Sequence, residues 1–115
     1  MSDAIEDEIQ AKGLTAPRVT PAMIEEVIAA EYCFTAWDAV GEGAPRLEHL
    51  KLLTICVLVL RNGFTVLGTS ACVSPEKFDA ELGRKIARGK ARDQVWPLEG
   101  YLLKEQLAVE SRLTL

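Results

Sequence analysis

Basic side chains gather in one short stretch of the sequence, between positions 77 and 92. If this stretch is an α-helix, a rotation of about 100° per residue places four of them on one side and a fifth at its edge. These candidate anion-binding residues are Lys77, Arg84, Lys85, Arg88 and Arg92. Guanidinium groups form paired hydrogen bonds with phosphates and carboxylates, so the pattern predicts a site for a nucleotide, a nucleic acid or an acidic protein. The alternative interpretation is the solvated side of an amphipathic helix, partly neutralised by Glu81.

Three cysteines and one histidine are the other reactive side chains: Cys33, Cys56, Cys72 and His49. The cysteines are odd in number, widely spaced and flanked by apolar residues, which favours small buried side chains over a disulfide framework or a metal site. A Cys–His nucleophile that uses His49 is the alternative. The sequence contains no phosphate-binding loop, HExxH motif or nucleophile elbow. We therefore expect no catalytic residue, no metal and no cofactor, with a small enzyme as the alternative.

The elements that would position these residues begin with a strongly apolar run, LLTICVLVL, at residues 52–60. An Asn-Gly pair follows at positions 62 and 63, and this pair tolerates the two positive φ angles of a type I′ turn. The sequence therefore predicts a β-hairpin in which Val59 lies opposite Val66 and Leu53 lies opposite Cys72. Residues 32–36 are the candidate third strand, with continuation of a preceding helix as the alternative.

Both faces of this hairpin are apolar in sequence, whereas an antiparallel hairpin in a small monomer usually has one polar face. Either helices cover both faces, or one face meets another copy of the chain. We therefore expect a homo-oligomer, most simply a two-fold dimer. The candidate interface residues are Leu58, Leu60, Leu67 and Val73.

Helices are predicted on both sides of the hairpin. Thr20-Pro21 and Ser74-Pro75 are helix start signals, and they predict helices over about 21–31 and about 75–95. We expect Pro97 to bend or interrupt the second helix before a further helix that ends near residue 110. Residues 3–11 fit a short acidic helix.

The expected fold class is α+β: a central antiparallel β-hairpin packed with an N-terminal helix and a long, Pro-interrupted C-terminal helical region. The expected domains are an acidic N-terminal arm or short helix, 1–19, and a single α+β domain, 20–115.

Composition limits the class of protein. A formal charge of −4 with 49% hydrophobic residues argues against disorder and against a generally basic nucleic-acid-binding protein. No apolar run reaches the roughly 18 to 20 residues of a membrane helix, and the first residues lack the pattern of a signal peptide. We expect a cytoplasmic protein that does not contact a membrane.

Four stretches between residues 11 and 107 carry a resemblance to a known family: AKGLTAPRVTP, EYCFTAWDAV, LLTICVLVLRNGFTVLGTSACVSPEKFDAELGRKIAR and VWPLEGYLLKEQL. The NGFTV turn, the strand-to-helix junction after it and the WPL step occur in the same order. The chain resembles the gene 49 / gene 66 family of small proteins from tailed double-stranded DNA phages and prophages. The resemblance implies a phage source and a location in the host cytoplasm. It implies no catalytic residue, because the family has no established activity.

Together these observations predict a non-catalytic phage accessory protein that acts by binding, to modulate the host or to counter its defences. Its ligand is open: the basic residues would suit a nucleotide signal or nucleic acid, and a host protein is the other candidate. A nucleic-acid-binding protein, a host-protein inhibitor and a minor virion component are the alternative functions.

Overall fold

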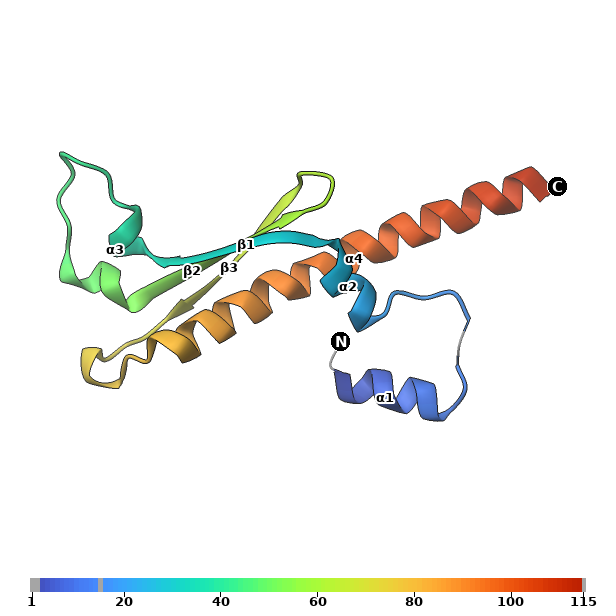
Figure 1. Ribbon diagram of the computed structural model, residues 1–115, viewed down its shortest axis with the longest axis horizontal. Helices are drawn as coiled ribbons and strands as arrows, with labels where there is room; N and C mark the ends of the chain where they lie inside the picture. The colour runs from blue at the N-terminus through green and yellow to red at the C-terminus, as the bar shows by residue number, and fades with distance from the viewer. Residues whose placement is uncertain (1–2, 15, 115) are drawn as a thin grey trace. The chain divides into compact units, whose positions relative to one another are not determined.

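The computed structural model describes residues 3–14 and 16–114, and Figure 1 shows its helices and strands. These elements form two compact units. One unit spans residues 28–92; the other combines the residues up to Val27 with those from Asp93 onward. The first contains β1 (Ile28–Thr35), α3 (Ala36–Ala39), η1 (Glu48–Leu52), β2 (Leu53–Leu60), β3 (Thr65–Ala71), η2 (Pro75–Lys77) and the first part of α4 (Ala80–Thr114). The second contains α1 (Asp3–Ala11), α2 (Pro21–Val27) and the remainder of α4. The α+β class is confirmed, whereas the expected domain boundary at residue 19 stays a prediction.

The three strands form one antiparallel sheet in the order β1-β2-β3. Burial alternates along β2: Thr54, Cys56, Leu58 and Leu60 are buried, and the residues between them are half-buried. Alternation of this kind marks a sheet with one face in the core, because successive side chains point to opposite faces. The third strand is confirmed, and it is longer than residues 32–36.

Helix α4 packs on the buried face of the sheet through small residues. Gly83, Ala87 and Ala91, each one turn from the next, are buried on α4. Gly68 on β3 lies opposite Ala87 and Ala91: a Cβ atom there would overlap the carbonyl oxygen of Ala87 and lie 2.5 Å from the Ala91 nitrogen. The helix and strand backbones therefore meet with no side chain between them.

The register of the hairpin is one residue away from the predicted register. Leu58 pairs with Val66 and Leu53 pairs with Ala71, so Val59 faces Thr65. A two-residue type I′ turn needs positive φ at both Asn62 and Gly63, but only Gly63 has it, at 88°.

The loop instead contains three residues. The Gly63 amide donates to the Leu60 carbonyl at 2.8 Å and the Leu60 amide donates to the Phe64 carbonyl at 2.8 Å. The Asn62 side chain accepts a hydrogen bond from the Phe64 amide at 3.0 Å, so Asn62 supports the turn although its own φ is not positive.

The helix boundaries also differ from the predicted ones. Helix α2 starts at Pro21 as expected but ends at Val27, because β1 begins at Ile28 and pairs with β2. The predicted start of the long helix at Pro75 is wrong: Pro75–Lys77 form a separate 3-10 turn, and α4 begins at Ala80. Asp79 caps that start, since its carboxylate accepts a hydrogen bond from the Leu82 amide at 3.1 Å.

Helix α4 runs through Pro97 without a break, so an interruption there is wrong, whereas a bend stays a prediction. Proline removes one backbone hydrogen bond and crowds the preceding turn, but it leaves the turns on both sides free to form.

The short acidic helix is confirmed as α1, and a paired ionic contact holds it to the segment that follows. Arg18 donates from Nη1 and Nη2 to the two carboxylate oxygens of Glu6, at 2.5 and 2.8 Å. Its Nε also donates to the Leu14 carbonyl at 3.2 Å. The hydrogen bond from Arg18 holds the pKa of Glu6 below its ordinary value.

Replacing Gly68 with Ala tests the close approach of α4 to β3. The added methyl group has to displace helix backbone, so we expect the free energy of unfolding to fall by about 2–3 kcal/mol. Gly89→Ala is the matched control, because a Cβ atom at Gly89 meets nothing within 4 Å. This control should gain about 0.5–1 kcal/mol, since alanine is the better helix former. Urea unfolding followed by circular dichroism measures both, and equal effects would contradict the packing.

Candidate functional site

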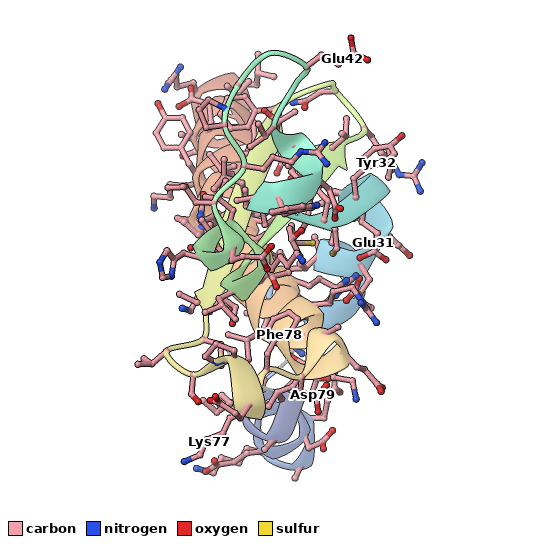
Figure 2. All side chains as sticks on the ribbon, turned by 90° about the vertical axis from the view of Figure 1, so that its left-hand side faces the viewer. Glu31, Tyr32, Glu42, Lys77, Phe78 and Asp79 are labelled. Carbon is pink, nitrogen blue, oxygen red and sulfur yellow. The ribbon has the colours of Figure 1, made fainter. Side chains whose placement is uncertain are left out.

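Three cavities of the 28–92 unit share one wall, the side chain of Phe78. Phe78 and Asp79 separate η2 from α4, and Phe78 is half-buried while its neighbour Lys77 is exposed. Figure 2 shows Lys77 extending away from the molecule, whereas Phe78 lies among the elements at this end. The surroundings of Phe78 are the candidate functional site, because the potentially reactive side chains of this unit gather there.

The smallest of these cavities, about 100 Å³, is the most polar and would suit acid–base chemistry best. Its carboxylate is Asp38, which accepts hydrogen bonds from the Thr35 amide and hydroxyl at 3.1 and 3.0 Å. In return the Asp38 amide donates to the Thr35 hydroxyl, which completes the N-terminal cap of α3. The bond from the Thr35 backbone is the main reason that the pKa of Asp38 lies below its ordinary value. Asp38 is therefore an ionised capping residue, not a proton donor at neutral pH.

The indole ring of Trp37 is contacted by two cations. The Lys51 ammonium lies 4.4 Å from the ring centroid, and the guanidinium carbon of Arg46 lies 5.3 Å from it. Such contacts stabilise a partly exposed site by about 0.5–1 kcal/mol each. Sequence reasoning missed this cluster, because the three residues meet only when the 40–47 loop folds back.

The structure divides the five candidate anion-binding residues. Lys77 is in η2, not in the long helix, and it lines the cavity that contains Cys72, whereas Arg84 lines the cavity that contains Asp38. Phe78 forms a wall of both cavities, so the single helical face that we predicted does not include Lys77.

Two of the other basic side chains are already paired with carboxylates of the protein. Arg88 Nε donates to Glu31 Oε2 on β1 at 2.6 Å, and Lys85 lies 3.4 Å from Glu81 one turn away. Arg92 also interacts within the protein. An anionic ligand would have to compete with these partners for the helix cations.

Two of the three cysteines form a pair. Cys33 on β1 lies directly opposite Cys56 on β2, and their sulfur atoms are 2.7 Å apart. Burial of Cys56 is the main cause, and its hydrogen bond with Cys33 the second cause, that raises the pKa of the Cys56 thiol to about 12. The third thiol, Cys72, donates to the Ser74 carbonyl at 3.2 Å. Sequence spacing could not reveal the pair, because it depends on the register between β1 and β2.

The Cys–His alternative receives no geometric support. His49 lines a cavity with Leu52 and Pro75, whereas Cys33 and Cys72 line the other two cavities. Among the residues that the structure describes, no group of three or more His, Cys, Asp or Glu side chains could hold a metal ion.

The model of a phage protein family, N4 Gp49/phage Sf6 gene 66, matches residues 19–107 of the chain. The chain belongs to this family. No curated protein and no solved structure matches it. The resemblance read from the sequence is thereby confirmed, and the match covers every element of the 28–92 unit. The helices of this gene 49/66 protein, over the described residues, lack a segment long and apolar enough to cross a membrane.

Apart from the cavities around Phe78, this gene 49/66 protein has a second surface of interest, the sheet face turned away from α4. On β2 and β3 its side chains alternate with the buried ones, and Tyr32 on β1 is 60% exposed and Leu67 on β3 52% exposed. We call it the open face: Ala30, Tyr32, Phe34, Leu53, Ile55, Val57, Val59, Thr65, Leu67, Thr69 and Ala71. None of these residues is charged, in a chain in which 26% of residues are.

The open face changes the list of candidate interface residues. Leu58 and Leu60 lie in the core, at 0% and 5% exposure, so they are not available to a partner. The predicted register, which is wrong by one residue, would put Leu58 and Leu60 on the same face as Leu67. Leu67 lies on the open face, and Val73, 99% exposed, follows the end of β3.

A double-mutant cycle tests whether Arg88 serves the fold. We expect Arg88→Ala and Glu31→Ala to show a coupling free energy of about 0.5–1 kcal/mol that decreases with added salt, because both side chains are partly exposed. Lys85 and Glu81, both 72% exposed, are the control pair and should couple by less than about 0.5 kcal/mol. Urea unfolding of the single and double variants gives both values. Additive effects at Arg88 and Glu31 would show that the pair does not stabilise the protein.

Proposed function

We propose that this phage protein is a non-catalytic accessory protein that acts by binding in the infected host cell, and that it does so as a homodimer. The open face of the sheet is the observation that carries the proposal. The polar groups around Phe78 support it indirectly, because Asp38 is engaged in the cap of α3 and Cys33 in its contact with Cys56.

A second copy is the occupant that suits the open face best. A two-fold interface brings each residue near an equivalent residue, so a face with charges would meet like charges, whereas an uncharged face does not. The side chains are apolar or hydroxylic and come from all three strands, which is the composition of the inner face of a β-sandwich. Two open faces packed together would remove the exposed apolar surface from water.

Host modulation or counter-defence is the role that we propose for the dimer. Membership of a phage protein family supports a role during infection. The proposed dimer would leave the Phe78 cavities and the exposed residues of α4 accessible to a host protein. An anionic ligand receives less support, because Glu31 and Glu81 already pair with two of the helix cations.

Light scattering on the purified protein tests the dimer. We expect a dimer at micromolar concentration, and we expect Leu67→Glu to yield a folded monomer. A carboxylate buried without a partner costs about 3 kcal/mol or more, which raises the dissociation constant at least about 100-fold. Tyr32→Glu changes the same face from another strand and should act in the same way.

Two control variants separate dissociation from unfolding. Leu58→Glu places a charge in the core and should unfold the chain, whereas Val73→Glu, at an almost fully exposed position, should leave both fold and dimer intact. Circular dichroism reports the fold of each variant. A wild-type protein that stays monomeric at these concentrations would contradict the proposed assembly.

A panel of anionic ligands tests the alternative. A ligand that binds the native state raises the melting temperature by mass action. We expect DNA, RNA and linear or cyclic nucleotides to leave it unchanged at physiological salt. A ligand that stabilises the wild type but not the folded Lys77→Ala/Arg84→Ala variant would favour anion sequestration over protein binding.

A further inference from the structure

Cys33 and Cys56 lie close enough to form a disulfide bond. Directly opposed residues of an antiparallel pair have Cα atoms about 4.5–5.5 Å apart, and disulfides span Cα distances of about 4.4–6.8 Å. The two sulfur atoms lie 2.7 Å apart on the same face of the sheet. Bond formation would therefore need only a small side-chain adjustment, without movement of β1 relative to β2.

The two thiols differ in their access to solvent. Cys56 is fully buried, whereas Cys33 is half-buried and lines the cavity of about 100 Å³ beside Phe78. Arg84 lines the same cavity, and its side chain is exposed. A small anionic reagent can approach Cys33 from this side, attracted by the guanidinium group, but it cannot reach Cys56 directly.

We propose that Cys33 and Cys56 form a thiol–disulfide exchange site that closes on reaction with a low-molecular-weight anionic disulfide such as glutathione disulfide. Cys33 is the entry thiol and Cys56 is the resolving thiol. Both thiols lie on the buried face of the sheet, so the exchange does not require the dimer proposed for the open face.

The reaction is an exchange in two steps. The Cys33 thiolate attacks one sulfur of the disulfide, whose sulfur–sulfur bond breaks, and the first glutathione thiolate leaves and takes up a proton. Cys56 then loses its proton and attacks Cys33 Sγ, which releases the second glutathione as a thiol. In total, two protein thiols are oxidised to one disulfide, and one glutathione disulfide is reduced to two glutathione molecules.

Closure would join β1 to β2 and enclose residues 34–55, which contain α3 and η1. A cross-link restricts the unfolded chain more than the folded one. The closed form should therefore have a melting temperature higher by roughly 5 °C or more, and reduction of the disulfide should return the melting temperature to that of the dithiol form.

Peptide mapping of the oxidised wild-type protein tests the proposal. Trypsin separates the three cysteines, because they lie in residues 19–46, 52–61 and 62–77. After incubation of the reduced protein with glutathione disulfide, we expect the intact mass to fall by two hydrogen atoms and a non-reduced digest to contain 19–46 joined to 52–61. Cys72 stays a free thiol and serves as the internal control.

Single variants assign the two roles. Cys56→Ser should accumulate glutathione on Cys33, Cys33→Ser should leave Cys56 unmodified, and Cys72→Ser should close like the wild type. If a variant does not fold, the wild-type digest still decides.

Three results would overturn the proposal. These are both thiols remaining free with glutathione disulfide in excess, a stable glutathione adduct on wild-type Cys33 without closure, and a cross-link that involves Cys72.

Discussion

The backbone of α4 lies directly against the backbone of β3 at Gly68, and the arrangement of the 28–92 unit depends on this contact. No side chain separates helix and strand there, since a single methyl group on Gly68 would overlap Ala87. The helix can approach so closely only because its facing residues are also small. This approach brings Arg88 within reach of Glu31 on β1 and leaves the larger Leu82 and Ile86 about half exposed, at 53% and 41%.

One helix, α4, covers one face of the three-stranded sheet, and the opposite, apolar face is not covered by it. Burial on the α4 side is complete for Cys56 and Leu58, so nothing more can be gained there. Tyr32 and Leu67 on the other side stay largely exposed. Because apolar area in contact with water favours association, the same sheet supplies a core on one side and would supply the driving force for the proposed dimer on the other.

The sequence predicted the kind of elements well and their contacts poorly. The apolar run, the Asn-Gly pair and the Ser-Pro signal located the hairpin and the helix after it, since these signals act over a few residues. The one-residue register error arose because Asn62 can support either of two loops, and only the tertiary structure selects between them. Leu82 and Ile86 give a stronger apolar pattern in the sequence than Gly83 and Ala87, but the close approach to the sheet buries the smaller residues and leaves the larger ones about half exposed.

The candidate site was harder to predict for the same reason: its parts come together only through strand pairing. Cys33 and Cys56 are far apart in sequence, and they meet because residues 30–35 pair with β2 in one continuous register. A slip of this register by one residue would turn the side chain of Cys33 to the other face of the sheet, away from Cys56. Glu31 would lose its position on the α4 side in the same way. One register therefore accounts both for the thiol pair and for the partner of Arg88, and neither contact could be read from sequence spacing.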